Sequence, residues 1–107
     1  MGYNFRSLSD GQLASSKSTI YTVPGATSTV VKMITFVNTN STSEKVNLYI
    51  KPNGSTSRRV IPEDMSLNAG YSLEYDAPLF LETGDIIEAD AETASVVDFI
   101  ILGVEKN

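Results

Sequence analysis

Turn-forming residues recur along the whole chain at intervals too short for a domain built of helices. They occur at residues 24–25, 38–43, 52–55, 62–64, 68–70, 76–78 and 83–85. In the segments between them, apolar and β-branched residues alternate with polar ones, and no long window keeps a helical period. This rhythm predicts an all-β domain, an antiparallel, jelly-roll-like β-sandwich of about eight short strands.

A chain of 107 residues fits a single domain. We expect residues 14–107 to form the sandwich, and residues 1–13 to form an N-terminal arm or an edge strand. Two segments, residues 29–38 and 95–104, are apolar on both of their faces. Strands of this kind are buried on both sides, so we expect these two at the centre. In a thin sandwich one of the two faces often meets no core of its own chain, which predicts an interface with another subunit.

The sequence contains neither histidine nor cysteine. It therefore lacks the commonest general base, the usual zinc ligand, and any thiolate or disulfide. The segment PGATST at residues 24–29 has neither the lysine nor the following helix of a phosphate-binding loop. We expect no enzyme, no catalytic residues, no cofactor and no metal.

The acid-rich segment LETGDIIEAD, residues 81–90, could be a metal site, a catalytic carboxylate pair or a turn between strands. A calcium loop needs alternating oxygen ligands, and Ile86 and Ile87 interrupt that alternation. A carboxylate pair that cleaves glycosidic bonds needs a cleft, which short loops in a small sandwich do not supply. We therefore expect a turn.

In this turn Gly84 would supply a positive φ, and Asp85 would hydrogen-bond to neighbouring backbone. The acids that follow alternate, so they share one face of a strand. We expect an acidic face, either solvated or at an interface, made of Asp85, Glu88, Asp90 and Glu92.

Charge is unevenly spread along the chain, which has a net charge of −5. Residues 1–62 carry seven basic and two acidic side chains, and residues 63–107 carry one basic and eleven acidic ones. The basic half is too dilute for nucleic acid or a membrane surface, because Arg58-Arg59 is its only adjacent pair. Either a basic face of one subunit meets an acidic face of the next, or the halves mix within one folded domain.

Neither a membrane span nor a signal peptide is apparent in the sequence. No apolar run is long enough to cross a bilayer, and the first ten residues lack the basic-then-apolar layout of a signal peptide. We therefore expect no membrane partner, and synthesis in a host cytoplasm without secretion by a signal peptide.

The order of the segments carries a resemblance. A strand IYTVP is followed by VVKMITFVN, by EKVNLYI, by the turn LNAGYS and by the hairpin LFLETGDIIEA. This layout resembles small bacteriophage virion structural proteins of the tail, baseplate, neck or head-decoration type. The resemblance covers about residues 18–104 and involves no catalytic motif. It implies a sandwich or jelly-roll fold, symmetric assembly, a place in the virion and contacts with other virion proteins.

The sequence and the resemblance together predict a self-assembling virion protein, with a trimer or ring as the expected symmetry. We expect the interface to come from the arm and the doubly apolar strands. Alternation assigns Val30, Ile34 and Phe36 to one face of the first of these strands. The expected interface residues are Phe5, Val30, Ile34, Phe36, Phe99 and Ile101. The alternative is a carbohydrate- or receptor-binding module with a stacking platform of Tyr49, Tyr71 and Tyr75.

Overall fold

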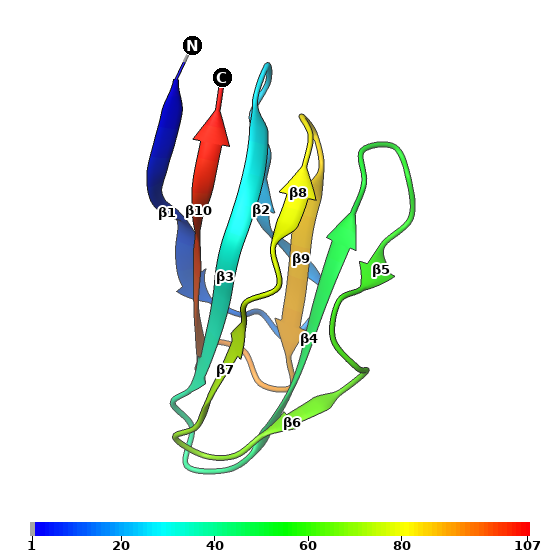
Figure 1. Cartoon of the computed structure of the whole chain (residues 1–107). Coiled ribbons are helices and arrows are strands. Elements are labelled where there is room, and N and C mark those ends of the chain that lie inside the picture. The colour runs from blue at the N-terminus through cyan, green and yellow to red at the C-terminus, as the bar shows by residue number, and fades with distance from the viewer. Residues whose placement is uncertain (1) are drawn as a thin grey trace.

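Two antiparallel β-sheets pack face to face in the computed structural model, which describes residues 2–107 (Figure 1). The β3–β10 sheet has the order β1 (Tyr3–Gln12), β10 (Val97–Lys106), β3 (Ser28–Asn38), β7 (Ser72–Tyr75), with β8 (Leu79–Leu81) also paired to β3. The β4–β9 sheet has the order β2 (Ser18–Thr22), β9 (Ile86–Ala91), β4 (Glu44–Lys51), β5 (Arg58–Arg59), with β6 (Met65–Leu67) also paired to β4.

The predicted all-β sandwich is confirmed, with ten strands in place of about eight. The difference arises at two sheet edges, where β7 and β8 share β3, and β5 and β6 share β4. Within residues 2–107, no helix is long and apolar enough to span a membrane.

The two doubly apolar segments form β3 and β10, which pair with each other in the middle of their sheet, as predicted. One face of this pair builds the core against β4 and β9. The fully or almost fully buried core side chains include Val31, Ile34, Phe36, Leu48, Ile87, Val97 and Ile101.

A β-bulge in β3 decides which of its side chains face the core. The register with β10 shifts at Lys32, which has no partner of its own. Before the bulge Val31 points inward, and after it Ile34 and Phe36 do, while Val30 lies on the outer face. Strict alternation assigned Val30 to the same face as Ile34 and Phe36. The structure corrects this assignment, because the extra residue reverses the alternation.

Gly103 lies opposite this bulge on β10, facing the interior. A β-carbon at this position would clash with the carbonyl oxygen of Val30 and come within 2.9 Å of a methyl group of Leu8. The close approach of the two backbones therefore requires glycine here.

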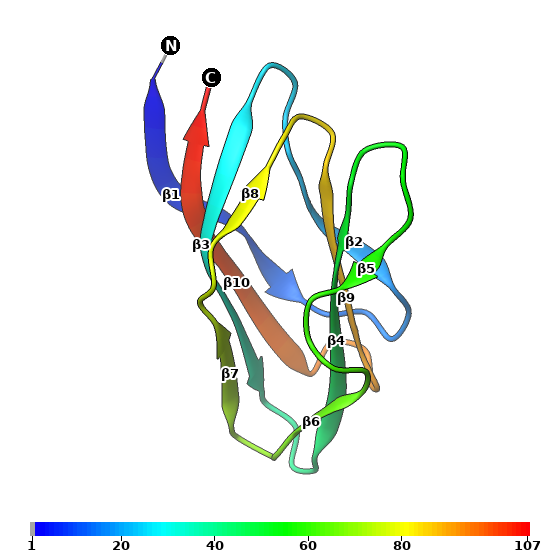
Figure 2. The same ribbon diagram turned by 45° about the vertical axis from the view of Figure 1, so that its right-hand side comes forward.

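The N-terminal segment forms β1, which lies at the edge of the sheet and pairs with β10 along its whole length. Met1, the first residue of the expected arm, lies outside the described residues. A bulge at Leu8 bends β1, and the strand then turns toward β2 (Figure 2). There Ser9 Oγ donates a hydrogen bond of 2.6 Å to the carbonyl oxygen of Ile20. One strand thus joins the two sheets along one side of the sandwich.

Candidate assembly face

The outer face of the β3–β10 sheet is apolar across four strands. One row of cross-strand partners runs from Phe5 on β1 to Val104 on β10, Val30 on β3 and Phe80 on β8. A second row pairs Leu102 with Met33, and a third passes through Ile100. We call this surface the apolar face; its residues are Tyr3, Phe5, Val30, Met33, Phe80, Ile100, Leu102 and Val104.

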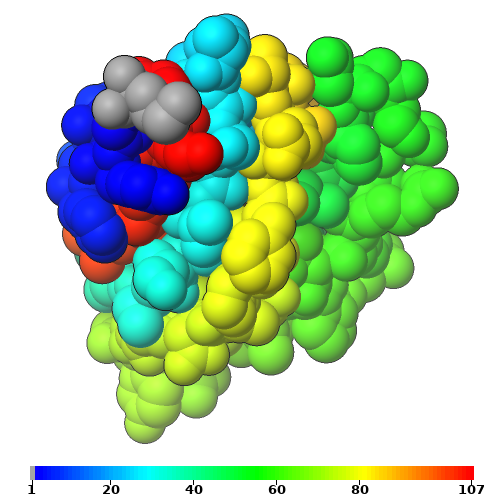
Figure 3. All heavy atoms as spheres, turned by 45° about the horizontal axis from the view of Figure 1, so that its top comes forward, coloured from blue at the N-terminus to red at the C-terminus, as the bar shows by residue number. Residues whose placement is uncertain are grey.

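The side chains of this face are unusually exposed for their size. The exposed fractions are 66% for Tyr3, 79% for Phe5, 77% for Phe80, 45% for Ile100 and 41% for Leu102. In the space-filling view the atoms of β1, β10, β3 and β8 form one continuous surface (Figure 3). Contiguous apolar surface of this kind on a small domain marks an interaction site.

A shallow hollow of about 310 Å³ lies within the apolar face. Tyr3, Phe5, Val30 and Val104 line it, together with the two lysines Lys32 and Lys106 and the adjoining residues Ser28 and Thr29. The hollow can take an apolar side chain from a partner.

Charged side chains mark the two ends of the apolar face. Lys106 lies at the end where the chain termini meet, with its Nζ 5.8 Å from the centre of the Tyr3 ring. At the opposite end Asp98 accepts a hydrogen bond of 3.0 Å from Gln12 Nε2. Asp10 and Glu74 stand in the same row as Ile100, beside Asp98. The face is therefore basic at one end and acidic at the other.

The expected interface residues divide between this face and the core. Phe5 and Val30 belong to the apolar face. By contrast, the core of the chain itself contains Ile34, Phe36, Phe99 and Ile101, which are at most 6% exposed. These four side chains are therefore not available for a contact between folded copies.

The turn predicted around Gly84 is confirmed. Gly84 has φ of +86°. The Asp85 carboxylate accepts hydrogen bonds of 2.9 Å from the N–H groups of Glu82 and Asn53. Asp85 thus ties the β8–β9 turn to the β4–β5 loop, and its role is structural.

The remaining acids of the expected acidic face lie along the outer face of the β4–β9 sheet, where neighbouring groups bind them. Glu88 accepts a hydrogen bond from Ser57 Oγ. Asp90 accepts bonds from Asn47 Nδ2 at 2.8 Å and Tyr49 Oη at 3.2 Å. Glu92, just beyond β9, accepts a 3.3 Å bond from the N–H of Lys45.

Basic side chains complete this polar surface. Lys17 and Arg59 lie over the Tyr49 ring, at 4.6 and 5.0 Å from its centre. Burial and the nearby Asp90 carboxylate raise the pKa of Tyr49. Because β4 of the basic half pairs with β9 of the acidic half, the two charge-biased halves mix within one domain.

The three tyrosines of the expected stacking platform do not share a surface. Tyr49 lies on the outer face of the β4–β9 sheet. Tyr75 pairs with Ile34 on the core side of the other sheet, and Tyr71 is exposed in the turn before β7. Within residues 2–107, no three His, Cys, Asp or Glu side chains gather where they could hold a metal ion.

A polar cluster closes the core at the end where the termini meet. Tyr21 Oη donates a 2.6 Å hydrogen bond to Glu105 and bonds Thr29 Oγ1 at 2.9 Å. Arg6 lies 3.7 Å from the Glu105 carboxylate. Burial, then the bond to Glu105, raises the pKa of Tyr21 to about 12. Sequence reasoning missed this cluster, because its members come from four separate strands.

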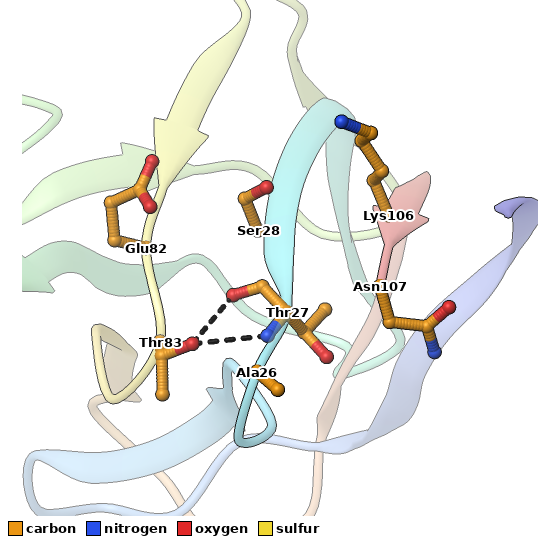
Figure 4. A pocket seen from close by; sticks show the side chains of 7 residues that line it. All are labelled: Ala26, Thr27, Ser28, Glu82, Thr83, Lys106 and Asn107. Carbon is orange, nitrogen blue, oxygen red and sulfur yellow. Dashed lines mark hydrogen bonds between the residues drawn. The ribbon is translucent and has the colours of Figure 1, made fainter. Parts of the chain in front are cut away.

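A second hollow of about 310 Å³ opens beside the apolar face, between the β2–β3 turn, the β8–β9 turn and the end of β10 (Figure 4). Thr83 Oγ1 accepts a 3.0 Å bond from the N–H of Thr27 and donates a 2.8 Å bond to its carbonyl oxygen. Glu82 and Lys106 line opposite sides of the hollow. The paired threonines hold two turns together, and the groups present suggest no reaction.

No protein-family model matches the sequence, and no curated protein matches it. Among solved structures, the fold is similar to that of a chain of infectious bursal disease virus, Gx strain. The TM-score is 0.56, with 13% identity over 97% of this chain. A chain in the crystal structure of the T13 IBDV viral particle gives a TM-score of 0.57, with 10% identity over 96% of this chain.

The chain spans about a third of the length of these virus chains, 32% and 30% respectively. A pentameric capsid protein from metagenomic phage sequences has 18% identity over 92% of this chain and 59% of its own length. Its TM-score is 0.41. The fold is therefore one found in proteins of viral particles, as the sequence resemblance implied.

Proposed function

We propose that this protein is a structural component of a virion, and that its copies assemble through the apolar face. The observation that carries the proposal is the apolar row from Phe5 to Phe80, whose two end residues are 79% and 77% exposed and contribute little to the chain's own core. The sandwich fold, similar to chains of a viral particle, supports it.

The apolar face has enough surface to drive reversible association. Full burial of one large apolar side chain contributes about 1.5–3 kcal/mol. The five most exposed residues of the face keep between 41% and 79% of their surface in water. Two such faces together would gain on the order of 10 kcal/mol, comparable with the roughly 4–15 kcal/mol that association costs. Contacts of this strength suit a shell or tube in which each copy makes several.

Within the virion we propose a tail, neck or head-decoration position, on the strength of the segment order described above. The partners would be further copies and other virion proteins. The expected trimer or ring stays a prediction. The carbohydrate-binding alternative loses its main support, because Tyr49, Tyr71 and Tyr75 lie on separate surfaces.

The test is absolute mass by light scattering on a size-exclusion column, at several concentrations and at low and high salt. We expect multimers of the wild-type chain at both salts, because apolar burial resists screening. Phe5→Asp and Phe80→Asp should each shift the mass toward the monomer.

Tyr71→Asp is the matched control, since Tyr71 is 64% exposed but lies off the apolar face. It should leave the mass unchanged. A wild-type chain that stays monomeric at every concentration would overturn the proposal.

A further inference from the structure

We infer that the apolar face binds a second copy of this chain, related by a two-fold axis perpendicular to the strands. The inference rests on the proposed function and adds the partner and its orientation. The argument comes from the charges at the two ends of the face, which make the face complementary to itself.

One positive and one negative side chain lie at equal distances from the middle of the outer side of β10. Lys106 and Asp98 lie on the same outer side of this strand, eight residues apart, with Leu102 midway. At about 3.3 Å per residue they are roughly 26 Å apart. Apolar residues occupy the outer side between them. Lys32 adds a positive charge beside the hollow, and Asp10 and Glu74 add negative charges near Asp98.

A two-fold axis in the plane of the contact has two limiting directions, parallel and perpendicular to the strands. An axis parallel to the strands would place Lys106 opposite its own copy, and Asp98 likewise. An axis perpendicular to the strands through Leu102 places each Lys106 opposite the Asp98 of the partner copy. Since like charges in apposition oppose association and opposite charges favour it, the second orientation is preferred.

The second orientation also agrees with how sheets pack. Stacked sheets keep their strands aligned within about 30°. Two β10 strands that cross at this angle over Leu102 would separate sideways by only about 7 Å at their ends. The long side chain of Lys106 can span such a gap to a carboxylate. Because Val104 and Ile100 lie equally far from Leu102, the rotation places the Phe5–Phe80 row of one copy over the Ile100 row of the other, with Phe5 and Phe80 at the two sides of the contact.

An isologous contact of this kind uses the same patch on both copies. It leaves the β4–β9 sheet and its polar surface free. Two-fold contacts combine with ring contacts elsewhere to give dihedral assemblies, so the inference is compatible with a trimer or ring built through other surfaces. Glu82, across Ser28 from Lys106 (Figure 4), borders the hollow above the face and would remain outside the contact.

Charge reversal with rescue tests the orientation. Lys106→Glu and Asp98→Lys should each weaken self-association on the order of tenfold, because each creates two like-charge pairs per dimer. Mixed one to one, the two variants should pair with each other at nearly wild-type strength, since both contacts become opposite-charge pairs again. Sedimentation equilibrium on each variant and on the mixture measures this.

Lys45→Glu, a reversal at an exposed site on the other sheet, is the matched control and should have no effect. Circular dichroism melts of each variant verify that it is folded. If both reversals weaken association but the mixture does not recover, the orientation is overturned. If Phe80→Asp abolishes association while the reversals do nothing, the copies do not meet in this orientation, and only the proposed function survives. A monomeric wild-type chain overturns both.

Discussion

Replacing Asn38 with alanine should remove the anchor that joins the end of β3 to the end of β6 and to the loop that leads into β4. The side chain is fully buried. Its Nδ2 donates 2.9 Å hydrogen bonds to the carbonyl oxygens of Thr42 and Leu67, and its Oδ1 accepts a 2.9 Å bond from the N–H of Asn40. One amide thus satisfies three backbone groups, two in the β3–β4 loop and one at the end of β6.

The magnitude follows from what alanine leaves behind. Each hydrogen bond contributes about 1 kcal/mol net, and a buried group left without a partner costs about 1–3 kcal/mol. The Thr42 and Asn40 groups are near the surface and can rehydrate, whereas the Leu67 carbonyl is enclosed. We therefore expect the free energy of unfolding to fall by about 3 kcal/mol. For a domain of this size that lowers the melting temperature by roughly 12–24 °C.

Urea unfolding followed by circular dichroism measures the loss. Asn4→Ala, at an exposed position on β1, is the control and should change stability by under about 0.5 kcal/mol. Asn38→Asp keeps the acceptor for Asn40 but loses both donors, so it should cost at least as much as alanine at neutral pH. A loss below about 1 kcal/mol for Asn38→Ala would refute the reasoning, because it would mean that the three bonds have equivalent replacements.

Three further outcomes follow from contacts within the chain. Gly103→Ala should lower the free energy of unfolding by about 1–3 kcal/mol, measured in urea, because a β-carbon there displaces the bulged backbone of β3. Burial and the bond to Glu105 raise the pKa of Tyr21 to about 12, so the folded state favours the neutral phenol. The free energy of unfolding should therefore stay constant below pH 10 and fall as the pH rises toward about 12. Tyr21→Phe should flatten this alkaline limb, and an unchanged limb would contradict the assignment. Burial alone would raise the pKa of Glu44, but hydrogen bonds from Thr93 and Asn40 lower it on balance. Glu44 should therefore stabilise the fold above the ordinary carboxyl pKa, and this stability should be lost as the pH falls through the lowered pKa of the folded state. In Glu44→Gln the free energy of unfolding should fall less with acid.

Local chemistry made much of the fold predictable. The turn at Gly84 and Asp85 needs only a positive φ and a carboxylate within reach of neighbouring backbone, and two adjacent residues supply both. The central place of β3 and β10 follows from their apolar residues on both faces. Signals of this kind act over a few residues, so a single sequence contains them.

The assignment of faces could not be predicted, because it depends on a bulge. Alternation has no marker for the extra residue at Lys32, and one extra residue turns every later side chain to the other face. The two acidic residues near the ends of β10 also lie on opposite faces. Asp98 lies on the outer face, as expected for a charged residue, but Glu105 is buried on the core face. Its partners Tyr21 and Arg6 come from strands distant in sequence.

The bulge at Lys32 also links the fold to the proposed assembly. Without it, Val30 would point inward together with Ile34 and Phe36, and the cross-strand row from Phe5 to Phe80 would be broken at its centre. With it, β3 supplies Ile34 and Phe36 to the core and Val30 to the outer face. The same strand can therefore serve two surfaces, and Gly103 permits the close backbone approach that this needs. Stability of the chain and association of its copies should consequently respond to different substitutions, because they depend on opposite sides of one pair of strands.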